Sequence, residues 1–257
     1  MKAAPPNFSM RVIMNSGQCF RIREPSPNSY SLFAYGRQLR VAHLGGDNYD
    51  FDCSPDEFDG LWRQYFDLDT DYGRYFPDNP TPFVERAFAF GRGMKMLRQE
   101  PWEMVVSYII SQRKNIPAIQ GCIEKLCALC GEKAGDGFEF PTREALAEAD
   151  LSGCSLGYRD KYVRAAATCG LDFAALKTLD DGKLRETLLS LYGVGEKVAA
   201  CVMLCGYGRL NSFPVDVWIR RVIEREHGGE TPDYGENAGI INQYLFYYIR
   251  SNWSELQ

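Results

Sequence analysis

The sequence lacks the features that mark several large classes of protein. Its 257 residues contain no run of about 18 apolar residues, the length that a membrane-spanning helix requires. The first six residues, Met1 to Pro6, have no apolar core of the kind found in a signal peptide. Only two histidines are present, His43 and His227. Few residues are therefore available for a zinc site or for a catalytic triad that uses histidine. We expect an intracellular protein that does not enter a membrane, in the cytoplasm or nucleoid if bacterial and in the nucleus if eukaryotic.

An excess of positive charge is also absent. The chain has 29 Lys and Arg against 34 Asp and Glu, a formal net charge of −5. This balance argues against a nucleic-acid partner, because neutralising phosphates requires basic side chains. It does not exclude one, since backbone N–H groups at helix starts bind phosphate without side-chain charge, and a small basic face can lie on an acidic protein.

The nine cysteines are odd in number and form no regular framework. Cys122, Cys127 and Cys130 suggest either a metal site or cysteines on the apolar face of a helix. The stretch 116–131 has helical apolar spacing, and no second cysteine pair or histidine partner follows it. Core cysteines are therefore the favoured interpretation, and we expect no metal and no cofactor.

The chain changes character near residue 54. From Ser54 onward the periodicity is helical, with Ser54 as N-cap and Pro55 at the first helical position. This order predicts an α+β fold: an N-terminal antiparallel β-sheet domain with the first helices over 1–80, then a mostly α-helical region over 81–257. Strands are predicted where β-branched and aromatic residues lie between turn clusters, at 8–12, 19–23, 30–34 and 38–44. Helices are predicted at 55–66, 82–91, 101–111, 116–131, 143–149, 161–169, 182–191, 196–206, 217–226 and 237–252.

The segment from Leu191 to Cys201 is the most informative part of the chain. It joins two predicted helices through Gly193-Val194-Gly195, two glycines around one apolar residue. Glycine permits a tight turn and the close approach of another backbone, and the unsatisfied N–H groups at the start of the second helix make an anion site. The segment is either a plain helix–turn–helix or a helix-hairpin-helix, over about 183–206, that binds DNA phosphate.

Lys197 lies in the first turn of the second helix, where the helix dipole disfavours a cation. If it is also partly desolvated, its amine loses a proton more easily and becomes a nucleophile. Further on, Pro214 leads into another helix, so Asp216 is an N-cap, a carboxylate facing Lys197, or both. Such a carboxylate would stabilise positive charge that develops on a sugar as its glycosidic bond breaks.

The hairpin glycines with Lys197, followed by Pro214-Val215-Asp216, resemble the helix-hairpin-helix, Gly/Pro…Asp glycosylase superfamily of DNA repair enzymes. The resemblance implies that Asp216 is the shared catalytic carboxylate. It also implies that Lys197 forms a Schiff base with deoxyribose, as in the members that are both glycosylase and lyase. No cysteine follows Cys205, which argues against the branches that carry a four-cysteine iron–sulfur loop after the aspartate.

Within this superfamily the chain is similar to the 8-oxoguanine DNA glycosylases over roughly residues 8–250. The segment around Gly17 resembles an early Ser-Gly-Gln-x-Phe-Arg motif, whose glycine carbonyl accepts the N7–H that distinguishes 8-oxoguanine from guanine. A later segment resembles Gly-Leu-Gly-Tyr-Arg, which implies that Tyr158 wedges into the duplex and that Arg159 contacts the orphaned cytosine. Without the resemblance, these residues are a turn glycine and an exposed loop.

The base pocket is implied by the same resemblance. Lys197 and Cys201 share a helix face one turn apart, and in the family the corresponding residues sandwich the extruded base. Phe246 matches the phenylalanine that stacks on the base. The glutamine that reads the edge of the base has its slot at Asn242, although Gln243 is adjacent.

Three further positions depart from the family pattern. Arg113 stands where an asparagine contacts the opposite cytosine, and Ala118 stands where an arginine enforces that cytosine. Trp218 occupies a slot where many members have histidine. The first two departures predict a relaxed preference for the base opposite the lesion.

Three functions stay open on the sequence. The first is a monomeric enzyme that flips 8-oxoguanine out of duplex DNA, excises it through Lys197 and Asp216, and cleaves the strand as an apurinic/apyrimidinic lyase. The second is the same fold acting on an alkylated or otherwise modified purine, which Arg113, Ala118 and Asn242 motivate. The third is a non-catalytic DNA-binding hairpin module, which the pairing of Lys197 with Asp216 argues against.

Overall fold

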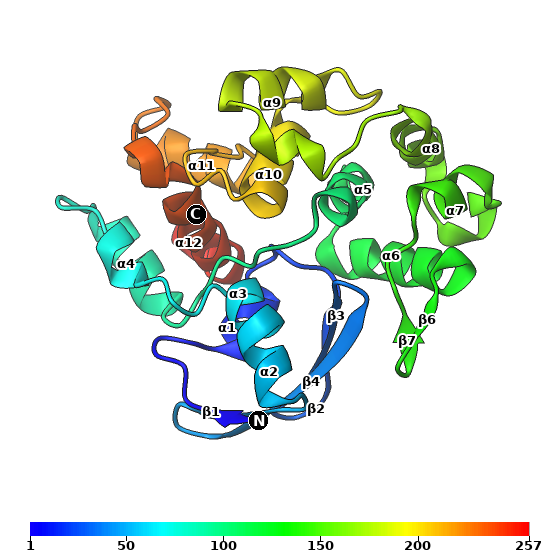
Figure 1. Ribbon diagram of the computed structural model, residues 1–257. Helices are drawn as coiled ribbons and strands as arrows, with labels where there is room; N and C mark the ends of the chain where they lie inside the picture. Colours follow the sequence, from blue (N-terminus) through cyan, green and yellow to red (C-terminus); the bar gives the residue numbers. More distant parts are fainter. Residues whose placement is uncertain (257) are drawn as a thin grey trace.

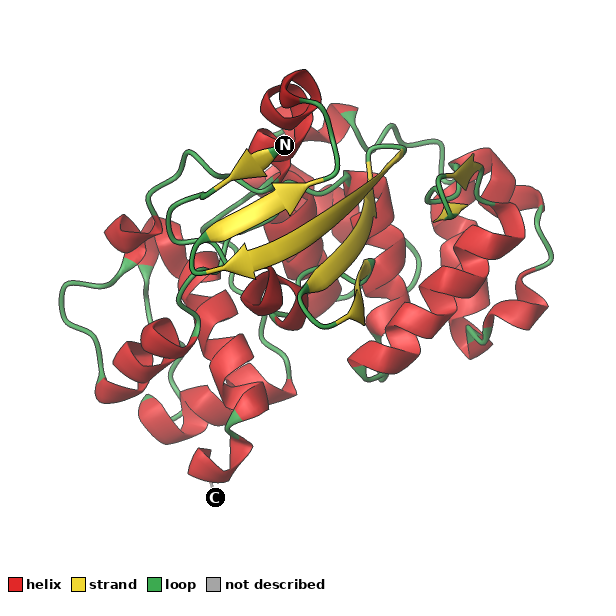
Figure 2. Ribbon diagram, turned by 90° about the horizontal axis from the view of Figure 1, so that it is seen from below, coloured by secondary structure: helices red, strands yellow, loops and turns green. Residues whose placement is uncertain are grey.

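A computed structural model describes residues 1–256 and shows an antiparallel sheet set against a larger body of helices. The sheet lies in front of the helices when the molecule is seen from below (Figure 2). All neighbouring strands are antiparallel, in the spatial order β1-β5-β4-β3-β2. The strands are β1 (Lys2–Ala3), β2 (Ile22–Ser26), β3 (Ser29–Ala34), β4 (Arg37–Gly45) and β5 (Asn48–Phe51).

The sheet buries only one of its faces. In β3 every second side chain is buried, because successive residues of a strand point to opposite faces. Tyr30 and Leu32 of β3, together with Val41 of β4, pack in a core that also contains the fully buried Trp62. Because buried and more exposed residues alternate along the strand, the sequence has the pattern of a half-buried strand.

The described chain has twelve α-helices, and α5 lies between α10 and α6 (Figure 1). They are α1 (Met10–Asn15), α2 (Pro55–Glu57), α3 (Arg63–Tyr65), α4 (Pro82–Phe90), α5 (Pro101–Ser111), α6 (Ile116–Cys130), α7 (Arg143–Glu148), α8 (Asp160–Thr168), α9 (Asp181–Leu189), α10 (Glu196–Tyr207), α11 (Val217–Glu226) and α12 (Ala238–Ser251). A small hairpin of β6 (Lys133–Ala134) and β7 (Gly137–Phe138) follows α6. A π-helical turn over Phe58–Trp62 joins α2 to α3.

Helix α5 is buried on nearly all sides because it forms the centre of the helical body. Its residues from Met104 to Ile110 are all buried. Helices α6, α8 and α10 pack against it, with α10 making the most extensive contact. A mostly hydrophobic helix belongs in the middle of a fold, and α5 takes that place. Among residues 1–256, no helix is both long and apolar enough to cross a membrane.

The predicted α+β class is confirmed, but one predicted strand is wrong and the strand predicted at 19–23 is displaced, because β2 spans Ile22–Ser26. Residues 8–12 were expected to form a strand, whereas Met10–Asn15 is the helix α1. The Ser9 hydroxyl caps this helix by accepting a hydrogen bond from the Val12 N–H at 3.3 Å. Met10 and Ile13, three residues apart, both face the sheet core. The prediction failed because a short run of apolar residues has the same composition in a strand and in a buried helix.

The described chain has two apolar cores. The smaller contains the sheet, α1 and the first helices, and the larger contains the helices from α4 onward. Tyr72 and Tyr75 precede residue 80, where the sequence suggested a domain boundary, yet they pack in the larger core. The boundary at residue 80 stays a prediction.

A buried ion pair joins the sheet to α5. The Arg21 guanidinium lies 3.3 Å from a carboxylate oxygen of Glu103, and both side chains are buried. Burial raises the pKa of the Glu103 carboxyl from 4.5 to about 7, and Arg21 opposes this shift only in part. The folded state therefore holds this proton over a pH range in which the unfolded chain has released it.

The free energy of unfolding is therefore expected to decrease as the pH rises between the two pKa values of Glu103, 4.5 in the unfolded chain and about 7 in the folded one. Relative to Glu103→Gln, the wild type should lose stability as the pH increases from 4.5 to 7. The loss follows from linkage and reaches at most about 3 kcal/mol. Chemical denaturation of both proteins across this range measures it, with Glu144→Gln on the exposed side of α7 as the control. A difference between wild type and Glu103→Gln that does not change with pH would contradict the assignment.

Candidate active site

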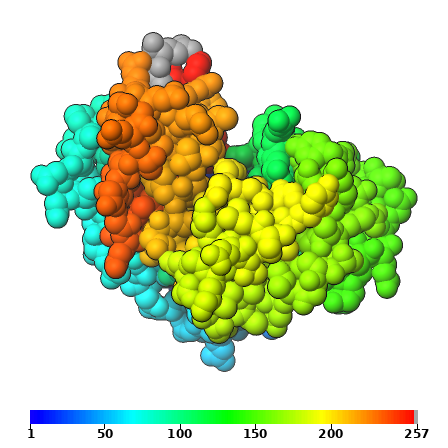
Figure 3. All heavy atoms as spheres, turned by 90° about the horizontal axis from the view of Figure 1, so that it is seen from above, coloured from blue at the N-terminus to red at the C-terminus, as the bar shows by residue number. Residues whose placement is uncertain are grey.

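A cavity of about 960 Å³ opens between the N-terminal residues 14–24 and the helical body. Seen from above, the surface is hollowed between the orange atoms, which include α11, and the green atoms of the segment after α5 (Figure 3). The segments that line it include the turn after α1, β2, the end of α5, the α5–α6 turn, the start of α6, α10, the start of α11, and α12. Its walls include eight residues that the sequence analysis singled out, namely Gly17, Arg113, Lys197, Cys201, Asp216, Trp218, Asn242 and Phe246.

The hairpin between α9 and α10 positions Lys197. The turn closes through a hydrogen bond of 3.0 Å from the Val194 N–H to the Leu191 carbonyl, and Gly193 has a φ of +84°. An added Cβ at Gly193 would lie 2.3 Å from the Tyr162 ring, so only glycine fits there. Gly195 is the N-cap of α10 and supplies no side chain to the first N–H groups of that helix. These groups stay available to an anion.

Lys197 reaches into the cavity from the first turn of α10. Its side chain is half-buried, and its Nζ lies 5.3 Å from the centre of the Tyr108 ring. One helical turn later, Cys201 is buried beside it. Burial raises the pKa of the Cys201 thiol, while the neighbouring Lys197 amine opposes the increase. Cys201 is therefore a neutral, apolar wall of the cavity next to the amine.

Asp216 is an N-cap and also faces the cavity. Its Oδ1 accepts hydrogen bonds of 2.9 Å from the N–H groups of Trp218 and Ile219, the first turn of α11. Among residues 1–256, no donor bonds the other oxygen, Oδ2. The segment before the cap is fixed by the Asn242 amide, which donates to the Pro214 carbonyl at 3.0 Å. One carboxylate oxygen thus holds the helix while the second stays free for chemistry.

The turn after α1 carries Gly17 in a left-handed conformation, with a φ of +83°. The carbonyls around it are bonded by side chains from distant elements: Asn15 by Arg250, Ser16 by Gln243 at 2.7 Å, and Gln18 by Gln99 at 2.8 Å. Within the described chain, no donor bonds the Gly17 carbonyl itself. Hydrogen bonds therefore hold the backbone on both sides of Gly17, whereas the Gly17 carbonyl has no partner among residues 1–256.

Phe246 and Arg250 of α12 press against Gly17. A Cβ added at this glycine would lie 2.8 Å from Phe246 Cε1 and 2.9 Å from Arg250 Nη1. The Arg250 guanidinium lies 5.3 Å from the centre of the Phe246 ring, and its buried Nη1 has no described partner. Burial lowers the pKa of Arg250, an effect that Tyr247 and Asp216 counteract. Sequence reasoning missed Arg250, although its position one turn after Phe246 was a usable signal.

Asn242 and Gln243 hold the walls of the cavity together. Both are buried, and each donates its amide to a backbone carbonyl, Asn242 to Pro214 and Gln243 to Ser16. The prediction that Asn242 reads the edge of a base stays untested. The sequence did not predict these two hydrogen bonds, because they join residues that are far apart in the chain. Asn242 lies 28 positions from Pro214, and Gln243 lies 227 positions from Ser16.

The residues predicted to touch DNA differ in how far they are exposed. Arg113 is exposed in the α5–α6 turn and has a left-handed φ of 53°. Tyr158 has 45% of its surface exposed, in the 3-10 turn before α8. Arg159 is only 6% exposed, and its guanidinium donates to the carbonyls of Gln112 and Leu156. Its predicted contact with an opposite base would require the guanidinium to leave these carbonyls.

Trp218 packs against the guanidinium of Arg221. The Arg221 guanidinium lies 5.2 Å from the Trp218 ring centre and 5.0 Å from that of Trp253. The two rings meet edge to face at 6.0 Å. Ala118 lies near the start of α6, where its N–H donates to the Asn115 cap.

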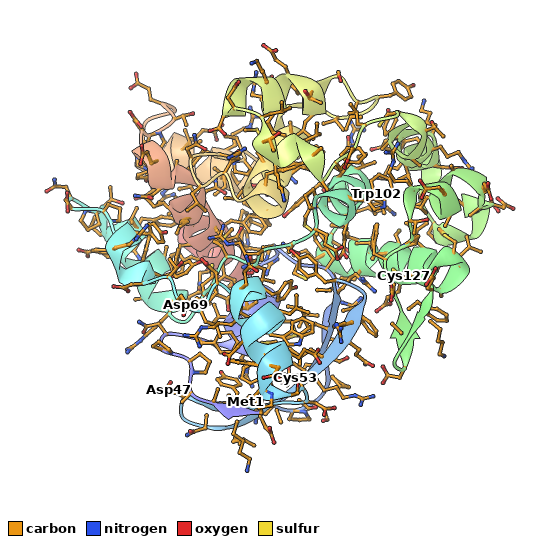
Figure 4. All side chains as sticks on the ribbon, in the orientation of Figure 1. Met1, Asp47, Cys53, Asp69, Trp102 and Cys127 are labelled. Carbon is orange, nitrogen blue, oxygen red and sulfur yellow. The ribbon has the colours of Figure 1, made fainter. Side chains whose placement is uncertain are left out.

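Within residues 1–256, no group of three or more His, Cys, Asp or Glu side chains is arranged to hold a metal ion. All nine cysteines are free. Cys122 and Cys127 are buried on α6, as predicted for core cysteines. Figure 4 shows Cys127 on α6 and Cys53 beside α2, in separate parts of the molecule.

Comparisons with known proteins identify the family of this chain. Residues 2–105 match the family of 8-oxoguanine DNA glycosylase N-terminal domains. The N-glycosylase/DNA lyase of Saccharomyces cerevisiae is 35% identical, over 84% of this chain and 67% of its own. A probable N-glycosylase/DNA lyase of Methanothermobacter thermautotrophicus is 30% identical over 72% of both chains.

Among solved structures, the 8-oxoguanine glycosylase/lyase of Clostridium acetobutylicum, bound to double-stranded DNA with cytosine opposite 8-oxoguanine, has a TM-score of 0.88 to this chain. The two are 30% identical and cover 96% of this chain and 93% of that one. The chain therefore belongs to the 8-oxoguanine DNA glycosylase family.

Proposed function

We propose that the protein is a monomeric base-excision repair enzyme that flips 8-oxoguanine out of duplex DNA into the cavity, excises it, and then cleaves the strand. The observation that carries the proposal is the convergence of three groups on one cavity: the Lys197 amine, the free oxygen of Asp216, and the unpaired carbonyl of Gly17. A DNA-binding module without catalysis has no need for this arrangement.

In the proposed reaction Lys197 acts in its neutral form. Its Nζ forms a bond to C1′ of the deoxyribose, and the glycosidic bond breaks with its electron pair leaving on the base, which takes up a proton. The covalent adduct opens to a Schiff base, from which loss of the C2′ proton expels the 3′ phosphate. Asp216 stabilises the positive charge that develops on the sugar, through the oxygen that α11 leaves free.

The lesion is recognised at the other end of the cavity. The Gly17 carbonyl accepts the N7–H of 8-oxoguanine, a donor that guanine lacks. Lys197 and Cys201 of α10 enclose the base together with Phe246 of α12, which stacks on it, and Asn242 lines the same cavity. A guanine in this place would set its N7 lone pair against the unpaired carbonyl, so the site discriminates by repulsion as well as by attraction.

DNA binding is assigned to the surface around the cavity. The hairpin residues Gly193, Val194 and Gly195 are assigned to backbone phosphate, which the N–H groups of the two glycines and of the first turn of α10 would bind, because the Val194 N–H already donates to the Leu191 carbonyl. These contacts would supply affinity despite the net charge of −5. Tyr158 is the wedge that fills the gap left by the flipped nucleotide. Arg113 and Ala118 replace groups that select cytosine, so we propose a relaxed opposite-base preference.

Competition between lesions tests this proposal. Duplexes containing 8-oxoguanine, 3-methyladenine or undamaged guanine at one position are mixed, and excision of each is followed in one reaction. The proposal predicts that 8-oxoguanine is released first. Preferential release of the alkylated purine would assign the site to a different lesion, and release of none would leave only a DNA-binding role.

Gly17→Ala is expected to damage lesion recognition while sparing strand cleavage. The added methyl group would clash with Phe246 and Arg250 and strain a backbone with a φ of +83°. We expect 8-oxoguanine excision to fall by about tenfold or more. Cleavage at a preformed abasic site, which places no base in the cavity, should change by less than about twofold on the same reasoning.

Gly45→Ala is the matched control for backbone strain. This glycine has a φ of +104° and no atom within 4 Å of an added Cβ, so substitution strains the backbone without touching the cavity. Equal losses of excision and abasic-site cleavage in Gly17→Ala would contradict the recognition role.

A further inference from the structure

An arginine of α11 is held between two tryptophan rings. The Arg221 guanidinium lies 5.2 Å from the centre of the Trp218 ring and 5.0 Å from that of Trp253. The two rings come from different elements, α11 and the 3-10 turn Trp253–Leu256, which contact each other. Indole is the ring that attracts a cation most strongly, so the two rings restrain a side chain that is otherwise free to change rotamer.

The N–H groups of this guanidinium are left without acceptors. Arg221 is exposed, and within the described chain it has neither a hydrogen bond nor an ion pair. Arg40, which is also exposed, has both, because its guanidinium lies 2.9 Å from a carboxylate oxygen of Asp136. A tryptophan ring offers no strong acceptor, so the five N–H donors of Arg221 stay available to an anion. Arg221 is thus a positioned cation without a counterion.

Arg221 lies beside the cavity. Trp218 lines the cavity, and so does Asp216, whose free oxygen is assigned to the sugar of the flipped nucleotide. From Asp216 to Arg221 the helix axis rises by about 7.5 Å. Successive nucleotides of one strand are about 3.4 Å apart along a duplex, so this rise corresponds to about two nucleotides. Figure 3 shows α11 among the orange atoms at the edge of the hollow.

The hairpin borders the same cavity, because Lys197 follows it directly and lines the cavity from α10. Its N–H groups are assigned to one backbone phosphate. A contact with a second phosphate at α11 would hold the strand at two points, one on each of the two helices that carry the catalytic pair. Fixing the backbone at two points favours the extruded nucleotide, whose loss of stacking has to be compensated.

A role in packing alone does not explain the charge of Arg221. An apolar side chain would fill the space between the two rings without leaving five donors unpaired. It would also avoid placing a cation on a helix whose N-terminal end already carries partial positive charge. The same partial charge favours an anion, so the helix and the guanidinium attract the same kind of ligand.

We propose that Arg221, fixed by Trp218 and Trp253, binds a backbone phosphate of the damaged strand within about two nucleotides of the flipped one. The planar fork of a guanidinium matches two oxygens of a phosphodiester. The inference rests on the proposed function, which assigns Asp216 to the sugar of that strand. It supplies a phosphate contact to a protein whose net charge is −5.

The salt dependence of DNA affinity tests this site without catalysis. The ligand is a duplex with one tetrahydrofuran abasic analogue, and Kd is measured for the full chain between about 50 and 200 mM salt. Arg221→Met keeps an unbranched side chain between the rings and removes the charge. It should make the slope of log K against log salt shallower by about 0.9, the contribution of one phosphate, and weaken binding several-fold. Arg221→Lys should keep the slope and lose part of the affinity, because an ammonium lacks the fork.

Neutral methylphosphonate linkages locate the phosphate. They replace the phosphates one at a time on both sides of the analogue. One replacement within two positions of the analogue should weaken binding by the wild type, and Arg221→Met should be insensitive to that replacement alone. Trp253→Leu, which releases one side of the guanidinium, should weaken binding less than Arg221→Met does. Combined with Arg221→Met it should add nothing, because the ring acts through the arginine.

Arg225→Gln is the matched control, since it removes one positive charge from the last turn of the same helix. Its slope should equal that of the wild type. Equal changes of slope in Arg225→Gln and Arg221→Met, a wild-type slope in Arg221→Met, or a methylphosphonate pattern that Arg221→Met leaves unchanged would each overturn the inference. If the predicted pattern is found but the wild type excises no 8-oxoguanine, the proposed lesion is wrong and the phosphate site stands.

Discussion

Lys197→Gln is expected to lower the single-turnover rate of 8-oxoguanine excision by at least about a thousandfold, because the amide cannot form a bond to C1′. The side chain keeps nearly the same length beside Tyr108 and Cys201, so the cavity should stay intact. DNA affinity should change by less than about threefold, since Lys197 faces the base cavity and the hairpin N–H groups are untouched. Rapid-quench kinetics and a binding titration on the same duplex measure the two effects.

The control for lost charge is Lys177→Gln, at an exposed position in the turn before α9. It removes one positive charge from the helical body without entering the cavity. If both variants slow excision equally, the effect is electrostatic and Lys197 is not the nucleophile. If Lys197→Gln retains a rate within about tenfold of the wild type, the covalent mechanism is wrong.

Asp216→Asn separates the two roles of this carboxylate. Asparagine is as good an N-cap as aspartate, so α11 should keep its first turn and the melting temperature should hardly change. The free oxygen loses its charge, however, and excision should fall by about 100- to 1,000-fold. Thermal unfolding and single-turnover excision of the same preparation measure both quantities.

Asp216→Ala provides the comparison. It removes the cap as well as the charge, and it should therefore destabilise the protein by about 1 kcal/mol more than the asparagine variant. Equal excision rates in the wild type and Asp216→Asn would show that Asp216 serves the fold alone. A large loss of stability in Asp216→Asn would show that its cap depends on charge.

The sequence predicted those parts of the site that depend on local structure. The hairpin follows from two glycines between apolar helices, and the cap at Asp216 follows from the extended approach through Pro214. Both features need only neighbouring residues to form. The buried cysteines of α6 were predictable for the same reason, because helical spacing places Cys122 and Cys127 on one apolar face.

The sequence could not show contacts between distant segments. Gln243 bonds the Ser16 carbonyl from 227 residues away, and Arg159 bonds the Gln112 carbonyl from 47 residues away. Neither pairing leaves a periodic signal. The strand expected at residues 8–12 failed on the same ground, because burial of Met10 and Ile13 against the sheet decides that α1 is a helix.

The central claim is that the Lys197 amine bonds to the sugar of the damaged nucleotide, and borohydride trapping tests it most directly. The protein is incubated with a duplex containing 8-oxoguanine opposite cytosine while borohydride reduces any Schiff base, and the adduct is digested and mapped by mass spectrometry. We expect a covalent adduct on the peptide that contains Lys197, and none with Lys197→Gln. An adduct on another residue, or excision by the wild type without any adduct, would contradict the mechanism.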